Sequence, residues 1–291
     1  MVSLVPGDNE GRINHILADR WVHYPQGDMT LDYLTDLLRG AKRTRMPSLL
    51  VVGEPDVGKT TIMKKFMRAH LARFDVATGR STQEVLGLEA PPEADEGRLY
   101  AAILSAAGAP FTRGRVIDLE HVVHEQLKRL GTRLLVIDET NNLVIGSGAA
   151  QRKTLAALRR LCNQLELSLA CFGTQEALNA FTSDPQIEGR AIPHLLVRLG
   201  NDENWAIIVK AVVAWFPLVE PSDIDAPFIQ KVFELSGGSP GKMFRLLNMC
   251  AVHAIDTGVE RITLETLAQD EVTRHVQTAA NMRRRSRTPV H

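Results

Sequence analysis

Up to about residue 200 the chain alternates between short apolar runs and longer segments whose apolar residues recur with helical periodicity. Short apolar runs bounded by polar residues are typical of strands buried on both faces. Strands are predicted at 48–52, 84–92, 134–137, 167–174 and 194–200, and helices at 59–74, 95–108, 118–131 and 151–166. Alternation of this kind predicts an α/β domain with a central parallel sheet.

Beyond about residue 200 the pattern changes. Four successive segments have helical periodicity, and Gly237, Gly238 and Gly258 provide turns between them. This predicts a small all-α domain after the α/β core. The predicted boundaries are 1–47 for an N-terminal segment, 48–201 for the core, 202–280 for the helical domain and 281–291 for a basic tail.

The turn after the first predicted strand reads GEPDVGKTT and fits the pattern G-x-x-x-x-G-K-[ST]. Its glycines let the backbone approach a phosphate, its N–H groups can point at the anion, and the next helix adds positive potential. Lys59 is expected to reach the β- and γ-phosphates of a nucleotide, and Thr60 to place its hydroxyl on Mg²⁺. The predicted phosphate loop comprises Gly53, Glu54, Pro55, Asp56, Val57, Gly58, Lys59, Thr60 and Thr61.

Two carboxylates, Asp138 and Glu139, follow the apolar run 134–137. One acid is needed to hold Mg²⁺, a hard cation that prefers oxygen ligands. A second acid can orient and deprotonate an attacking water. An adjacent pair at a strand end can supply both, which predicts nucleotide hydrolysis; the alternative is two solvated acids in a turn.

The 79 residues from Lys59 to Asp138 are too many for a single βαβ crossover, which needs about 30, so an additional strand is expected between them. The best candidate for that strand is 84–92, and the resulting order is the pattern of the additional-strand P-loop ATPases. Thr174 ends the next predicted strand, where such ATPases place a polar sensor of the γ-phosphate or its water. The same threonine is equally suited to cap the helix that follows.

Arg190 lies between a turn at 183–185 and the last predicted strand. In ring ATPases this connection faces the next subunit, where a guanidinium can stabilise transition-state charge on the neighbour's nucleotide. The alternative is an ordinary exposed arginine. Arg198, which we expect inside the strand, is the second candidate for the same arginine finger.

Charge and cysteine content narrow the class of protein. The 34 Lys and Arg balance the 34 Asp and Glu, so any nucleic-acid surface must be a local patch. Four arginines fall within 283–287, a run expected in a disordered tail or a nucleic-acid arm. The three cysteines lack metal-ligand spacing, which predicts reduced, buried thiols in a cytoplasmic protein. No signal peptide and no membrane-spanning run is predicted.

Taken together, the motifs resemble those of the TniB/TnsC group of AAA+ transposition regulator ATPases, and TniB above all. The resemblance covers about residues 12–275 and includes RINHILADRWVHYP, MPSLLVVGEPDVGKTTIMKKF, EAPPEADEGRLYAAIL, LLVIDETNNLVIGS, CFGTQEA and SDPQIEGR. It implies an AAA+ P-loop core with a parallel sheet of order 5-1-4-3-2 and a small C-terminal all-α lid. By motif it implies ATP and Mg²⁺ as ligands, with phosphates and metal at Lys59 and Thr60, metal support from Asp138, water activation by Glu139, a sensor at Thr174 and a finger in trans at Arg190.

The same resemblance implies a homo-oligomer, either a ring or a helical filament, on duplex DNA of any sequence. It implies recruitment of a DDE transposase, communication with a TniQ-type target selector, and disassembly driven by slow ATP hydrolysis. One position departs from the pattern, because Gly241 stands where many AAA+ lids carry an arginine; Lys242 or Arg245 is the candidate substitute.

Candidate DNA contacts are Arg113, Arg115, Arg152 and Lys153, since a protein that tracks duplex phosphates needs exposed cations. Each of the four is also compatible with a plain solvated charge. Two other functions stay open: a monomeric signalling NTPase switch without a DNA role, and a replication initiator or helicase loader with the same core.

Overall fold

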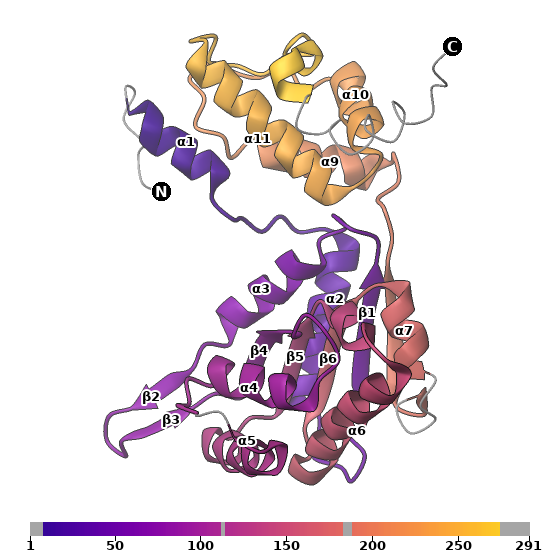
Figure 1. Cartoon of the computed structure of the whole chain (residues 1–291). Helices are drawn as coiled ribbons and strands as arrows, with labels where there is room; N and C mark the ends of the chain where they lie inside the picture. The colour runs from indigo at the N-terminus through magenta and orange to yellow at the C-terminus, as the bar shows by residue number, and fades with distance from the viewer. Residues whose placement is uncertain (1–7, 112–113, 183–187, 274–291) are drawn as a thin grey trace. The chain divides into compact units, whose positions relative to one another are not determined.

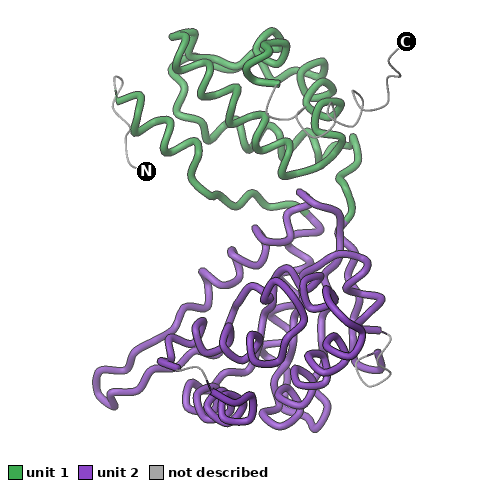
Figure 2. Tube along the Cα trace, in the orientation of Figure 1, with its two compact units in different colours: residues 1–24, 197–291 green, residues 25–196 purple. Residues whose placement is uncertain are grey.

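The computed structural model describes residues 8–111, 114–182 and 188–273. The chain divides into two compact units, residues 25–196 and residues 1–24 together with 197–291 (Figure 2). The predicted N-terminal segment 1–47 is therefore split between them. Helix α1 (Asn9–Leu17) packs on helix α11 of the second unit, whereas helix α2 (Pro25–Arg39) packs on strands of the first.

The first unit is built on a five-stranded parallel sheet of order β4-β5-β6-β1-β7 (Figure 1). Numbered one to five along the chain, these strands read 5-1-4-3-2 from the other edge. Their bounds are β1 (Ser48–Gly53), β4 (Val85–Glu89), β5 (Leu134–Asp138), β6 (Ser168–Gly173) and β7 (Ala191–Leu196). The apolar runs form the three inner strands because both faces of these strands are buried.

Helices cover both faces of this sheet. Alternate strand residues such as Leu50, Leu135 and Cys171 join a core with α4 (Glu96–Ala106), α5 (Val116–Leu130), α6 (Gly148–Leu165) and α7 (Gln175–Thr182). The residues between them point to the opposite face, which α2 and α3 (Lys59–Ala69) cover. A short 3₁₀ helix, η1 (Thr140–Val144), follows β5 directly.

The helix predicted at 59–74 ends earlier than its periodicity suggested. After α3 the chain forms a separate antiparallel ribbon of β2 (Arg73–Asp75) and β3 (Arg80–Thr82) before it enters β4 (Figure 1). The ribbon has no apolar alternation facing a core, so the hydrophobic pattern carried no signal for it.

The second unit contains α1, α9 (Glu203–Val213), α10 (Ala226–Ser236), α11 (Pro240–Asp256) and the 3₁₀ helix η2 (Thr266–Ala268). Side chains of Asp202, Asp225 and Ser239 accept backbone N–H bonds at the starts of α9, α10 and α11, which fixes where each helix begins. The fourth predicted helical segment is described only to residue 273, and the basic tail lies outside the described residues.

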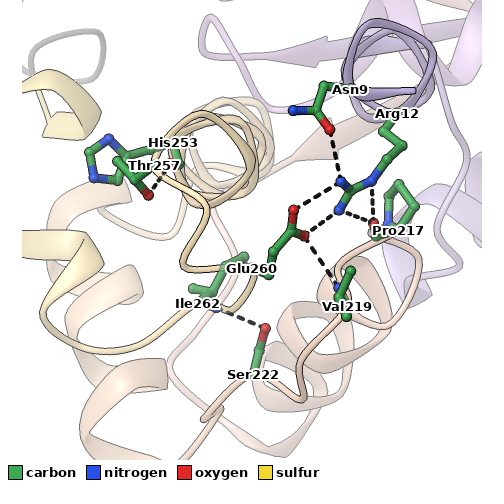
Figure 3. A network of polar contacts seen from close by, with 9 residues as sticks. All are labelled: Asn9, Arg12, Pro217, Val219, Ser222, His253, Thr257, Glu260 and Ile262. Atoms are coloured by element: carbon green, nitrogen blue, oxygen red, sulfur yellow. Dashed lines mark hydrogen bonds and ion pairs between the residues drawn. The ribbon is translucent and has the colours of Figure 1, made fainter. Parts of the chain in front are cut away.

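A buried arginine fastens α1 within this second unit (Figure 3). Arg12, only 3% exposed, uses all five of its N–H donors. It donates to both carboxylate oxygens of Glu260, twice to the Pro217 carbonyl (3.0 and 2.8 Å) and to Asn9 Oδ1 (3.1 Å). The bond from Arg12 holds the pKa of Glu260 below its ordinary value. The ion pair therefore ties the N-terminal helix to a segment almost 250 residues away.

The three cysteines are free and buried, as predicted; Cys162 lies in α6, Cys171 in β6 and Cys250 in α11. Burial raises the pKa of Cys162 and of Cys250 to about 12, so these thiols stay protonated. Among the described residues, every helix is too short or too polar to cross a membrane.

Candidate functional site

The phosphate loop connects the end of β1 to the start of α3. Gly58 has φ 100°, a conformation that favours glycine, and it begins α3 directly after the turn. Gly53 has no room for a side chain, because a Cβ there would meet the Leu196 carbonyl oxygen at 2.6 Å and Val57 Cγ2 at 2.8 Å. Gly58 is thus explained by its backbone angles, and Gly53 by the lack of space for a side chain.

Lys59 extends over the same loop. Its Nζ donates to the carbonyl oxygens of Gly53 at 2.8 Å and Glu54 at 2.9 Å. Burial lowers the pKa of Lys59, while the negative charges of Glu139, Asp138 and Asp56 act in the opposite direction. The ammonium group therefore lies at the loop, close enough to Glu139 and Asp138 for their charges to favour its protonated form.

Asp138, at the end of β5, is 6% exposed and joins the two motifs. Its Oδ2 accepts the Thr60 hydroxyl at 2.7 Å, and its Oδ1 accepts the Glu139 N–H at 2.9 Å. A hydroxyl and a carboxylate at this distance form an all-oxygen donor pair, which suits a magnesium ion. The structure brings Thr60 and Asp138 together although 78 residues separate them in the sequence.

Glu139 is exposed and has left-handed backbone angles, φ 51° and ψ 39°, which are unfavourable for a non-glycine residue. The next residue holds the turn in place. Thr140 is 1% exposed, and its Oγ1 donates to the carbonyl oxygen of Phe172 in β6 at 3.0 Å. Strand β6 therefore supports the turn that presents Glu139 to solvent.

Gly173, the last residue of β6, also lies against this turn. A Cβ at Gly173 would lie 2.4 Å from Thr140 Oγ1 and 3.4 Å from the backbone nitrogen of Asn141. Thr174 follows immediately, and its hydroxyl donates to Glu176 Oε2 at 2.6 Å. The sequence analysis missed Thr140 and Gly173, because a hydroxyl and a glycine at these places have meaning only once β5 and β6 are adjacent.

A family model described as Bacterial TniB protein matches residues 12–200, which is more than half of the chain. The chain belongs to the TniB family. The resemblance on which the sequence analysis relied is thereby confirmed, and the matched range contains the phosphate loop and the acid pair.

This TniB-family protein is also similar to a curated protein and to solved structures. The GTPase Der of Solidesulfovibrio magneticus (strain ATCC 700980 / DSM 13731 / RS-1) is 26% identical over 193 residues, which are 65% of this chain and 41% of Der. The chain thus spans less than half the length of that relative. An Aeropyrum pernix ORC1 protein solved in complex with DNA has TM-score 0.64 and 18% identity, covering 92% of this chain and 69% of ORC1. Drosophila ORC bound to DNA has TM-score 0.59 and 13% identity, covering 92% and 67%. These structures share the fold.

Arg190 lies at the opposite end of the sheet from the phosphate loop. Its carbonyl oxygen accepts the N–H of Ser48, the first residue of β1, at 3.0 Å, while the loop follows the last residue of β1. At about 3.3 Å per residue, the length of β1 alone places the two about 16 Å apart. The Nη1 atom of Arg190 donates to Asn163 Oδ1 at 2.6 Å. The guanidinium is therefore far from the phosphate loop of its own chain.

Arg198 does not lie inside a strand, so the predicted extension of the last strand to residue 200 is wrong. Its place as the second candidate for the arginine finger stays a prediction. Strand β7 is paired with β1 from Ala191 to Leu196, and it ends where β1 turns into the phosphate loop and no partner remains. Arg198 follows that strand, and its Nη1 approaches the Gly237 carbonyl oxygen at 3.4 Å.

The candidate DNA contacts are spread over different elements. Arg113 lies outside the described residues. Arg115 precedes α5 and forms a two-point ion pair with Asp118, at 3.1 and 3.2 Å, although its side chain is 82% exposed. Arg152 and Lys153 are exposed near the start of α6. These cations do not form one described cluster.

Proposed function

We propose that this TniB-family protein is an ATP-dependent regulator of DNA transposition. In this proposal it assembles as a homo-oligomer on duplex DNA, recruits a DDE transposase, and links that enzyme to a TniQ-type target selector. ATP hydrolysis then disassembles the oligomer. The observation that carries the proposal is the hydrogen bond from Thr60 of the phosphate loop to Asp138 of the acid pair, in a chain of the TniB family.

In this proposal each residue of the site has its own role in ATP binding or hydrolysis. The backbone N–H groups after Gly58 and the ammonium of Lys59 bind the phosphates of ATP, because the loop and the helix start present positive potential to an anion. Thr60 and Asp138 are the residues that would hold Mg²⁺, which when bound neutralises phosphate charge. Glu139 accepts a proton from the attacking water, and its exposure beside the buried Asp138 suits that task.

Arg190 acts on the nucleotide of another subunit in this proposal. Its separation from its own loop, about 16 Å along β1, supports a role in trans. A guanidinium inserted from a neighbour stabilises charge on the transferred phosphate, so hydrolysis depends on assembly. Thr174 senses the γ-phosphate from the end of β6, next to the turn that holds Glu139.

Assembly explains how a protein with zero formal net charge can bind DNA. Each subunit needs only a few phosphate contacts, because the linked subunits of an oligomer bind together with far higher avidity than one alone. The shared fold with ORC proteins solved on DNA is compatible with this partner.

The test is sedimentation of the protein with duplex DNA, with ATP, a slowly hydrolysed ATP analogue, or GTP. The proposal expects cosedimentation with ATP or the analogue, and electron micrographs of rings or filaments on the DNA. ATP turnover should require Lys59 and Glu139. Wild-type protein that binds ATP yet stays monomeric and does not bind DNA would refute the proposal.

The similarity to the GTPase Der favours one competing function, a nucleotide switch that acts as a monomer. That function predicts GTP preference and no cosedimentation with DNA. The same assay separates the two, because the nucleotide and the oligomeric state are read in one experiment. A strong preference for one short DNA sequence would instead favour a replication initiator.

A further inference from the structure

The ribbon of β2 and β3 is the most exposed described segment of the sheet unit. Every residue from Leu71 to Thr82 is exposed, and the ribbon forms its own two-stranded sheet apart from the five parallel strands (Figure 1). Because none of these residues is buried, packing does not explain the sequence of the ribbon, and an isolated two-stranded ribbon is only marginally stable in water.

The register of the ribbon separates its side chains into two faces. Arg73 is opposite Thr82, Phe74 opposite Ser81, and Asp75 opposite Arg80. Since alternate residues of a strand point to opposite faces and directly paired residues share a face, Arg73, Arg80 and Asp75 lie on one face and Phe74 on the other. The two arginines are diagonal neighbours on that face, close enough to bind adjacent phosphates of one strand.

Positive charge continues from the ribbon along α3. Lys64 and Arg68 are exposed and one helical turn apart, just before the chain enters the ribbon. Between residues 60 and 83 the sequence has five Lys and Arg and one acid, Asp75, although the whole chain has no formal net charge. This segment is therefore a local basic patch of the kind that a neutral DNA-binding protein requires.

Asp75, the single acid among residues 60–83, ends β2 opposite Arg80, and its carboxylate is bonded to the turn that follows. Asp75 Oδ1 accepts the Ala77 N–H at 2.9 Å, and its Oδ2 accepts the Thr78 hydroxyl at 2.7 Å. These bonds lower the pKa of Asp75 and shape the loop between the strands. At the other end, Gln83 anchors the ribbon, because its N–H donates to the Leu130 carbonyl at 2.8 Å and its own carbonyl accepts the Thr132 hydroxyl at 3.0 Å.

We propose that the basic face of this ribbon, Arg73 and Arg80, together with Lys64 and Arg68 of α3, is the surface that binds the phosphates of duplex DNA. The proposal rests on the proposed function, which supplies DNA as the partner. A two-stranded ribbon has the width that the major groove admits, and its arginines can contact phosphates without reading sequence. This surface replaces the scattered candidates Arg115, Arg152 and Lys153.

The experiment measures the affinity of the full chain for random-sequence duplex DNA, with the slowly hydrolysed ATP analogue, between 50 and 200 mM salt. Arg73→Ala with Arg80→Ala is expected to weaken binding roughly tenfold and to make the slope of log K against log salt shallower by about two, since two phosphate contacts are lost. Arg73→Lys with Arg80→Lys should restore most of the salt slope, because the charges return.

Control variants distinguish the loss of DNA contacts at this surface from a mere change of net charge and from loss of assembly. Lys210→Ala with Arg261→Ala changes the net charge equally at exposed positions of the second unit, and is expected to leave the slope unchanged. If Arg73→Ala with Arg80→Ala binds DNA like wild type, the ribbon is not the DNA surface. If Phe74→Ser alone abolishes assembly while the arginine variant is normal, the ribbon docks a protein and our inference is wrong. Wild-type protein that fails to bind any duplex would instead refute the proposed function.

Discussion

Replacing Thr140 by valine tests how the turn that presents Glu139 is held. The substitution keeps the shape of a side chain that is 1% exposed and removes the hydroxyl that donates to the Phe172 carbonyl at 3.0 Å. Loss of a buried hydrogen bond costs about 1–3 kcal/mol. Glu139 is in a left-handed conformation that costs a non-glycine residue about 1–2 kcal/mol. Because the two quantities are similar, the turn should relax when the bond is lost.

Relaxation of the turn displaces Glu139 and leaves the phosphate loop unchanged. Each 1.4 kcal/mol is a factor of ten in rate, so kcat for ATP hydrolysis should fall about 10- to 100-fold in Thr140→Val, with nucleotide affinity unchanged. Steady-state turnover and fluorescent-nucleotide titration measure the two separately. Thr140→Ser retains a hydroxyl and should recover most of the rate.

A double variant distinguishes a positioning effect from general destabilisation. If Thr140 acts through Glu139, then Thr140→Val should cause little further loss of turnover in a Glu139→Gln background. Full additivity, a wild-type rate in Thr140→Val, or equal loss in valine and serine variants would each refute the reasoning. So would loss of nucleotide affinity, since that would place the effect at the phosphate loop.

Four other substitutions test the phosphate-loop region, Arg190 and the ion pair of the second unit. Glu139→Gln should bind ATP and hydrolyse it poorly, so its assemblies on DNA should persist in an ATP chase; wild-type turnover would contradict water activation by Glu139. Lys59→Ala should lose about 1.5–3 kcal/mol of nucleotide affinity in a titration, and mixing it with Arg190→Ala should restore some activity that neither has alone, unless Arg190 is not a finger in trans. Arg12→Ala should lower the free energy of unfolding in urea by about 3 kcal/mol, the lower end for a broken buried pair because the Glu260 side chain is 19% exposed. Arg12 lowers the pKa of Glu260 from its usual 4.5, so this difference from wild type should be present above that pH and be lost as pH falls through the folded-state pKa; a pH-independent difference would contradict the ion pair.

The sequence by itself determined the nucleotide site and the class of fold. Both follow from short-range patterns, because Gly58 has a left-handed backbone within the loop itself, and buried parallel strands must be apolar on both faces. The need for glycine at Gly53 arises instead from the Leu196 carbonyl of the neighbouring strand β7. The position of Asp138 and Glu139 at a strand end was also readable, since four consecutive apolar residues, Leu134 to Ile137, precede the two acids. Such motifs can be recognised from sequence because their chemically important residues lie within a few positions of one another.

Only the tertiary structure decided which distant residues act together. The bond from Thr140 to Phe172 depends on β5 and β6 being neighbours, and the pairing of Arg12 with Glu260 depends on how both ends of the chain meet in the second unit. The end of β7 at Leu196, and hence the place of Arg198, was set by the length of its partner β1. The ribbon at 73–82 left no trace in the hydrophobic pattern, because none of its faces packs on a core and its exposure is a property of the folded surface alone.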